Sequence, residues 1–222
     1  MTLDILQAQC AQYVANAMSG DPAHDLLHVK RVVKNTLHLT DIEEANRLVT
    51  VAAAWLHDCV TVAKDSPDRS RASQLAAEAA GRFLRRIDYP DALIPDVCHA
   101  IEAHSYSANI EPRSIEAKIV QDADRLEALG AIGIARCFLT AGSMGSALYR
   151  EQDPFCHERQ PRDREYAVDH FYGKLLRLPA TMQTAAGKAE AERRVQFMRL
   201  YLQRLGQEIT HQPDETESGI SL

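Results

Sequence analysis

The chain has 222 residues, of which 45% are hydrophobic and 25% charged, a composition that suits one globular domain with a substantial core. Its 31 acidic residues outnumber its 25 Lys and Arg residues, giving a formal net charge of −6. Because nucleic-acid backbones are held by excess positive charge, we do not expect a nucleic-acid groove. The chain starts without a basic segment and contains no run of about 18 apolar residues, so we expect a cytoplasmic protein without a membrane span.

Residues typical of helix starts and helix ends recur through the first half of the chain. Small polar residues and prolines stand at the expected helix starts, and the pair Ser19-Gly20 ends the first helix. The first predicted helix covers residues 3–18, and the second begins at Asp21-Pro22. The third begins at Asp41 and runs to residues 57–58, and a fourth begins at Ser66-Pro67. Apolar residues recur at helical spacing within these segments.

The second half continues the helical pattern. Pro90 and Pro95 flank the start of a helix that carries His99 and His104, and Ser114 is placed to cap the next one. Gly130 and Gly133 mark close packing or a bend further along. Two C-terminal helices are predicted near residues 164–177 and 183–208.

These signals define the fold class and the domain organisation. With no internal repeat and no long alternating pattern, we predict an all-α protein whose residues 1–210 form a single domain. Residues 142–163 are rich in Gly, Pro and charge, which predicts a long loop of the kind that serves as a lid. The polar residues 211–222 predict a disordered tail. The five cysteines form no Cys-x-x-Cys pair, so we expect reduced thiols at Cys10, Cys59, Cys98, Cys137 and Cys156.

Histidine and aspartate residues occur in an order that suggests a metal centre. His57-Asp58 ends the apolar run VTVAAAWLHDCV, where a charged pair is costly to bury without a partner. His28 lies in an earlier apolar helix, and the segment AKIVQDADRLEALGAIGIA sets Asp122 and Asp124 between apolar turns. A cation would neutralise such carboxylates. The alternative is that these side chains pair with Lys or Arg across packed helices.

Four segments then carry a resemblance to a known family. HDLLHVKRV, AAWLHDCV, AIEAHS and VQDADRLEALGAIGIAR follow the order seen in the HD-domain metal-dependent phosphohydrolases, and the chain resembles that superfamily over about residues 20–208. It is most similar to a compact bacterial branch related to nucleotide pyrophosphohydrolases, which has a segment similar to DHFYGKLLRLPATMQTAAGKAEAERRVQFM. The resemblance implies a single HD-domain helical bundle, with its motif-bearing core at about residues 20–130 and C-terminal helices at about 164–208.

The resemblance also implies a set of metal ligands. They are His28, His57, Asp58 and Asp124. We prefer Asp124 to Asp122 because the family's ligand directly precedes a basic and then a hydrophobic residue, here Arg125-Leu126. Nitrogen and oxygen donors of this kind suit a divalent metal, with manganese expected first and iron, nickel, cobalt or magnesium as alternatives.

Further residues are candidates for contacts outside the ligand set. His24 and Asp25 could orient a ligand or cap their helix, and His99 is expected to be structural. We expect Asp58 and Asp122 to assist catalysis. Four residues are predicted to bind the substrate phosphates, namely Lys64, Arg69, His104 and Lys174.

The predicted function is the hydrolysis of a small phosphorylated substrate. A nucleotide is expected, with cleavage of a triphosphate to monophosphate and pyrophosphate through attack of a metal-bound water on phosphorus. One alternative is a nucleotide-binding regulatory protein with a structural metal. The other is an HD-type di-iron oxygenase, which would require His99 and His104 to turn inward together. The sequence leaves open whether the chain forms a homo-oligomer.

Overall fold

The computed structural model describes residues 1–17, 26–60, 62, 70–105 and 108–210 of the chain. It confirms the all-α prediction, since no strand occurs among these residues and the one isolated bridge pairs Ala147 with Tyr166. Within the same ranges no single helix is long and apolar enough to cross a bilayer, although the bent pair Ile115–Ala128 and Gly130–Ser143 meets that test jointly. The predicted tail at residues 211–222 lies outside the described residues.

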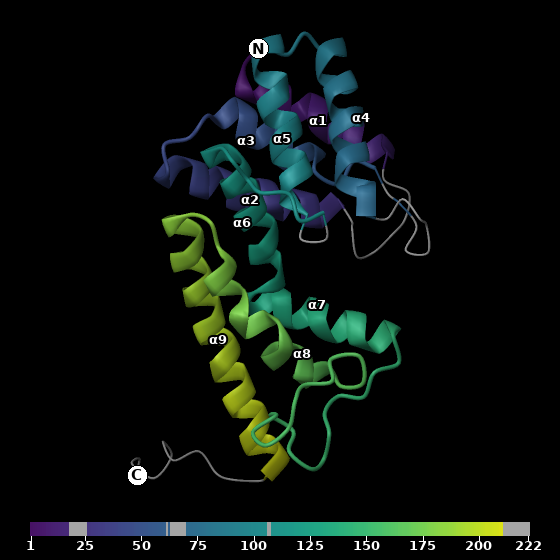
Figure 1. Ribbon diagram of the computed structural model, residues 1–222, viewed down its shortest axis with the longest axis vertical. Coiled ribbons are helices and arrows are strands. Elements are labelled where there is room, and N and C mark those ends of the chain that lie inside the picture. The colour runs from purple at the N-terminus through teal and green to yellow at the C-terminus, as the bar shows by residue number, and fades with distance from the viewer. Residues whose placement is uncertain (18–25, 61, 63–69, 106–107, 211–222) are drawn as a thin grey trace, which may run out of the picture.

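The N-terminal part is a cluster of helices around one buried helix (Figure 1). Its members are α1 (Leu3–Ala17), α2 (Leu26–Ile42), α3 (Arg47–Leu56), α4 (Ala72–Arg86), η3 (Asp91–Leu93), α5 (Ile94–His104) and α6 (Ile115–Arg125). Every residue of α3 from Val49 to Leu56 is buried, and the run of three alanines lets α1, α2 and α5 pack closely against it. The metal-ligand candidates His57 and Asp58 directly follow this central helix.

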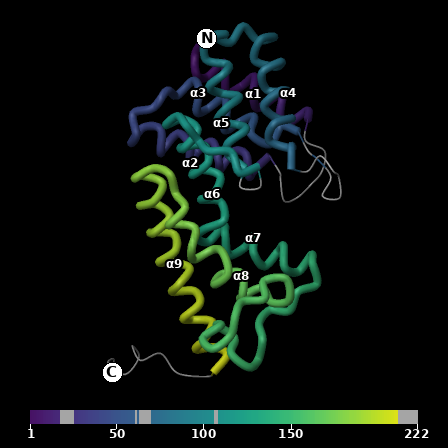
Figure 2. The backbone as a smooth tube through the Cα atoms, in the orientation of Figure 1, coloured from purple at the N-terminus to yellow at the C-terminus, as the bar shows by residue number. Residues whose placement is uncertain are grey.

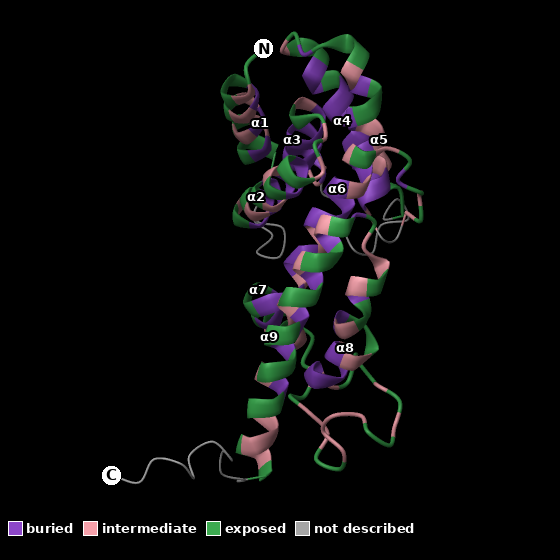
Figure 3. Cartoon of the chain, turned by 90° about the vertical axis from the view of Figure 1, so that its left-hand side faces the viewer, coloured by how far each residue is buried: buried purple, intermediate pink, exposed green. Residues whose placement is uncertain are grey.

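The C-terminal part is built on α6, which extends beyond the helices around α3 (Figure 2). It consists of η4 (Leu126–Ala128), α7 (Gly130–Ser143), α8 (Ala167–Gly173), η5 (Leu175–Thr181) and α9 (Ala185–Thr210). In Figure 3 the long helix α9 is buried on one side and exposed on the other. Arg194 on α9 donates hydrogen bonds to the carbonyl of Leu126, at 2.7 Å, and to Asn35 Oδ1, at 2.9 Å. These bonds join α9 to both η4 and α2.

Two predicted helix boundaries are wrong. The helix predicted to begin at Asp41 begins at Arg47, because α2 continues to Ile42 and the Asn46 side chain caps the next helix by accepting a hydrogen bond from the Leu48 amide. Near residues 164–177 the α-helical hydrogen bonding ends at Gly173, and a 3-10 segment follows. By contrast, the predicted cap at Ser114 is confirmed by its hydrogen bond from the Ala117 amide.

The long loop after α7 is tied to the helices by a buried ion pair. Asp169 on α8 is fully buried, and it accepts hydrogen bonds from the Arg159 guanidinium, one of them at 2.7 Å, and from the Arg162 amide at 2.7 Å. Burial opposes ionisation of this carboxyl group, but the hydrogen bonds outweigh that effect and lower the pKa of Asp169.

Glycine permits the sharp turn between α6 and α7. Gly130 has a φ of +70°, in the left-handed region that favours glycine. A Cβ atom on Gly133 would lie 2.2 Å from the carbonyl oxygen of Ala128, whereas one on Gly142, in the same helix, would meet nothing within 4 Å. The prediction that Gly130 and Gly133 mark close packing or a bend is therefore confirmed.

We predict that Gly133→Ala destabilises the protein by about 2 kcal/mol, because the new methyl group meets backbone that can move only with η4. Gly142→Ala is the matched control and should be neutral or stabilising by about 0.5 kcal/mol, since alanine is the better helix former. Urea unfolding of both variants measures the difference. Equal stability of the two variants would contradict the packing at Gly133.

We further predict that Asp169→Asn lowers the free energy of unfolding at pH 7 by about 3 kcal/mol, since it leaves the Arg159 charge without its buried partner. The depressed pKa of Asp169 means that its contribution is present above the pKa of the unfolded state, near 4, and is lost as the pH falls through the folded-state value. Urea midpoints from pH 7 to pH 2 should therefore fall less steeply below pH 4 in the variant. An unchanged acid limb would contradict the assignment.

Candidate metal centre

His57 is aimed by the end of the helix that precedes it. Its ring is fully buried, and Nδ1 donates to the carbonyl of Ala54 at 2.8 Å, one of the last carbonyls of α3. This bond leaves the lone pair on Nε2, which is buried and has no hydrogen-bond partner. Burial lowers the pKa of His57, which favours the neutral ring that a metal requires.

His104 is oriented in the same way by the end of α5. Its Nδ1 lies 2.6 Å from the carbonyl oxygen of Ile101, and its Nε2 lies 3.6 Å from Asp58 Oδ1. Burial opposes protonation of this ring, but the hydrogen bond to Asp58 outweighs burial and raises the pKa of His104. The His57 and His104 rings meet edge to face, with their centroids 4.9 Å apart.

His28 and Asp124 complete the cluster from α2 and α6. His28 Nε2 lies 3.4 Å from Asp124 Oδ1, and that oxygen lies 4.0 Å from His57 Nε2. Burial would raise the pKa of Asp124, yet its hydrogen bond to His28 and the nearby imidazoles lower it strongly. Burial likewise opposes protonation of His28, but bonds to Asp124 and Glu127 raise its pKa to about 9.

These side chains fit a divalent metal ion. Ligand atoms of His28, His57 and Asp58 all lie within 4.8 Å of one another, and Asp58 Oδ2 is 3.5 Å from His57 Nε2. The unpartnered Nε2 of His57 is a buried polar atom that a cation would satisfy. Asp58 and Asp124 remain 28% and 30% exposed, so the centre is open on one side. Two imidazoles and two carboxylates would leave coordination positions for solvent and substrate.

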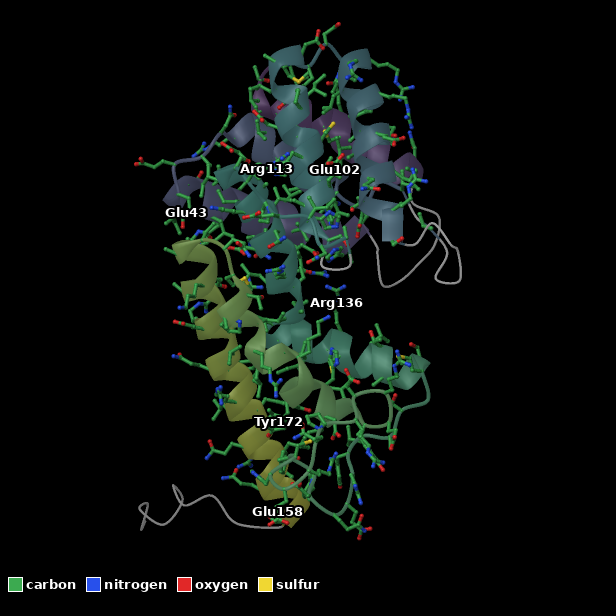
Figure 4. All side chains as sticks on the ribbon, viewed as in Figure 1. Glu43, Glu102, Arg113, Arg136, Glu158 and Tyr172 are labelled. Atoms are coloured by element: carbon green, nitrogen blue, oxygen red, sulfur yellow. The ribbon has the colours of Figure 1, made fainter. Side chains whose placement is uncertain are left out.

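Two charged residues near His28, Glu127 and Arg136, were not identified from the sequence, whereas the helical spacing had placed Arg31 on the same face as His28. Glu127 is buried in η4, with Oε2 3.4 Å from His28 Nδ1 and 2.7 Å from Arg31 Nε. Arg136 on α7 points from that helix toward the N-terminal helices (Figure 4), and its Nη1 lies 3.4 Å from the Glu127 carbonyl oxygen. Glu127 follows Asp124 by three positions, and this same-face spacing is the signal that could have found Glu127.

The structure does not bring Asp122 to the cluster. Asp122 is fully buried and faces away from Asp124, because positions two apart on a helix point to nearly opposite sides. Its carboxylate accepts hydrogen bonds from the Gln183 amide and from the amide and hydroxyl of Thr184, at 2.8–3.1 Å. These bonds hold the start of α9, which explains why Asp122 is available neither as a ligand nor as a proton acceptor at the centre.

The remaining predicted residues are distributed as follows. Lys174 lies at the junction of α8 and η5 and lines a cavity that Asp124 also lines. His99 lies on the surface, where its Nε2 accepts a hydrogen bond from the Arg113 amide at 3.0 Å, and it does not join His104. Four candidates lie outside the described residues: His24, Asp25, Lys64 and Arg69.

A cavity of about 410 Å³ adjoins the cluster between α7, α8 and η5. Its walls are largely apolar and include Cys137, Met144, Leu175 and Leu178. Four basic side chains line it, namely Arg125, Arg136, Arg164 and Lys174. Asp124, Asp163 and His170 line it as well. An elongated anion with an apolar portion matches this lining.

The chain is similar in sequence and in structure to known proteins. The HD domain family model matches residues 26–129. The YpgQ protein of Bacillus subtilis is 34% identical over 192 residues, covering 84% of each chain. An HD-superfamily hydrolase from Bacillus thuringiensis is similar in structure, with a TM-score of 0.75, 32% identity and coverage of 95% of this chain and 100% of that one. Bacillus subtilis YpgQ in complex with ADP gives a TM-score of 0.71, 32% identity and coverage of 94% and 97%.

We predict that Asp124→Asn lowers the content of bound divalent metal, whereas Asp122→Asn leaves it unchanged and lowers stability by about 2 kcal/mol through the weakened attachment of α9. Metal quantified by mass spectrometry after dialysis, together with urea unfolding, separates the two effects. Loss of metal from Asp122→Asn alone would reverse the assignment of the fourth ligand.

Proposed function

Because the chain belongs to the HD-domain superfamily of metal-dependent phosphohydrolases, we propose that it hydrolyses a nucleoside phosphate at a metal centre formed by His28, His57, Asp58 and Asp124. The observation that carries the proposal is the cavity beside the cluster. It shares Asp124 with the cluster and is edged by cationic side chains. The phosphates would lie at the metal end and the nucleoside along the apolar walls.

The length of the cavity supports a nucleotide over a small phosphate ester. Gly133, close to η4, and Met144, just beyond the C-terminal end of α7, both line it. Eleven helical residues at about 1.5 Å each separate these positions by roughly 16 Å. Inorganic pyrophosphate or a simple phosphomonoester would fill one end only, whereas a nucleoside phosphate reaches both. The ADP complex of the Bacillus subtilis relative supports the same substrate class.

A divalent cation, when bound, supplies a Lewis acid for the phosphoryl oxygens and lowers the pKa of water. Manganese is our first choice, and iron, nickel, cobalt or magnesium would also suit the nitrogen and oxygen donors. Asp58 lies between His57 and His104, where it can bind the metal and accept a proton from the attacking water.

His104, Lys174 and Arg136 are our candidates for phosphate contacts. His104 Nε2 lies 3.6 Å from Asp58 Oδ1, and Asp58 is 28% exposed, while the two cations line the cavity. Each is placed to donate to phosphoryl oxygens and to neutralise charge there. Lys64 and Arg69 stay predictions. The oxygenase alternative is not favoured, because His99 is turned to Arg113 at the surface.

The experiment is a hydrolysis panel with metal-stripped protein that is resupplied with manganese, iron, nickel, cobalt or magnesium. Ribonucleoside and deoxyribonucleoside triphosphates, ADP and p-nitrophenyl phosphate are the substrates, and pyrophosphate and orthophosphate are measured separately. We expect metal-dependent release of pyrophosphate and nucleoside monophosphate from triphosphates. Release of orthophosphate alone would redirect the assignment to another bond. Absence of turnover in protein that retains metal and binds nucleotide would favour the regulatory alternative.

We predict that Lys174→Ala raises KM for the nucleotide about tenfold, about 1.4 kcal/mol, with a smaller change in kcat, because it removes a cation from the cavity edge. Arg177→Ala is the matched control. Arg177 is an exposed cation three residues further along, which lines a separate surface depression with Tyr172 and Arg199. Steady-state kinetics of the two variants test the placement, and an equal KM in both would remove Lys174 from the substrate site.

A further inference from the structure

Glu127 is a buried carboxylate that the proposed reaction does not use. Its side chain is only 2% exposed, although an ionised carboxylate is costly to remove from water. It lies in the short 3-10 segment between α6 and α7, three residues after Asp124. A carboxylate that served only to join two helices could do so at the surface, so its burial beneath the metal centre calls for a specific reason.

Both partners of this carboxylate come from α2. Glu127 Oε2 lies 2.7 Å from Arg31 Nε and 3.4 Å from His28 Nδ1. The bond from Arg31 is the shorter of the two, and because a guanidinium can only donate, Glu127 is the acceptor in it. Arg136 Nη1 lies 3.4 Å from both the backbone oxygen of Glu127 and His28 Nδ1. Because a guanidinium can only donate, a proton on Nδ1 leaves the Glu127 carbonyl as the acceptor for Arg136.

His28 stands at the opposite end of its helix from the other two histidines of the cluster. His57 and His104 stand at the C-terminal ends of α3 and α5, where free carbonyls accept their Nδ1 protons at 2.8 and 2.6 Å. His28 is the third residue of α2, and the free backbone groups at a helix N-terminus are N–H donors. The acceptor that the structure places at His28 Nδ1 is a side chain from another element, the carboxylate of Glu127 in η4.

We propose that Glu127 is the positioning residue for the metal ligand His28. It accepts the Nδ1 proton of His28, so that Nε2 faces Asp124 and is the nitrogen that would exchange its proton for the metal, and Arg31 holds Glu127 in place. A ligating histidine whose second nitrogen is bonded to a carboxylate is both oriented and made a stronger donor. The inference rests on the metal centre of the proposed function, but it requires metal binding only and not turnover.

The test compares Glu127→Gln with Asp169→Asn. Both remove the charge of a buried carboxylate that is bonded to an arginine, but Asp169 lies on α8 and contacts no ligand candidate. Isothermal titration of metal-stripped protein with Mn²⁺ gives the affinity, and urea unfolding of the same samples gives the stability. We expect Glu127→Gln to weaken Mn²⁺ binding at least tenfold, and Asp169→Asn to lose stability with Mn²⁺ affinity within twofold of the unsubstituted protein.

A spectroscopic measurement separates positioning from general damage to the fold. In the Zn²⁺-loaded protein, the Nδ1 proton of His28 should give a downfield proton resonance that shifts upfield in Glu127→Gln, while those of His57 and His104 stay in place. Unchanged Mn²⁺ affinity in Glu127→Gln, with a stability loss like that of Asp169→Asn, would overturn the inference and leave the hydrolytic function standing. Weakened metal binding in a protein that hydrolyses no nucleotide would support the inference and overturn the function.

Discussion

The metal centre depends on the hydrogen bond between His57 Nδ1 and the carbonyl of Ala54. A fully buried imidazole has two nitrogens to satisfy, and α3 satisfies one of them by ending directly before His57, so that the Ala54 carbonyl in its last turn accepts from Nδ1. The other nitrogen is then left with a lone pair in the interior. A cation is the partner that removes this deficit while also neutralising Asp58 and Asp124, so the same constraint that orients the ring also calls for the metal.

The rest of the fold holds the surrounding helix ends in fixed positions around the His57 ring. α3 is buried along its length, so its end cannot shift without displacing α1, α2 and α5. The last turns of α6 make contacts on two opposite sides of the helix. Asp124 faces the centre, whereas Asp122 binds the start of α9, and a Cβ atom on Gly187 would lie 2.3 Å from the Asp122 carboxylate. The helix that presents a ligand is thereby fixed to the part of the chain that forms the cavity.

Much of this arrangement could be predicted from sequence, because the helical period, the Ser114 cap and the glycines at 130 and 133 are local signals. The end of α2 could not, since Asp41 is a good capping residue and only tertiary packing keeps α2 helical through Ile42. The ligand candidates were found by residue type and order. Glu127 was missed and Asp122 was expected at the centre, because a carboxylate's partner depends on which side of α6 and η4 it occupies. Those partners, Arg31 and Thr184, are far away in sequence.

The bend after η4 links the metal centre to substrate recognition. Gly130, with its positive φ, lets α7 leave α6 at 64° so that α7 runs along the cavity, and this direction places Arg136 within 3.4 Å of both His28 Nδ1 and the Glu127 carbonyl. Arg136 therefore contacts the residues that support a ligand and also lines the substrate cavity. An anion bound in the cavity would contact the Arg136 guanidinium, which already lies against Glu127, the residue that we propose to orient His28. Phosphate binding and the orientation of His28 are for this reason expected to be coupled.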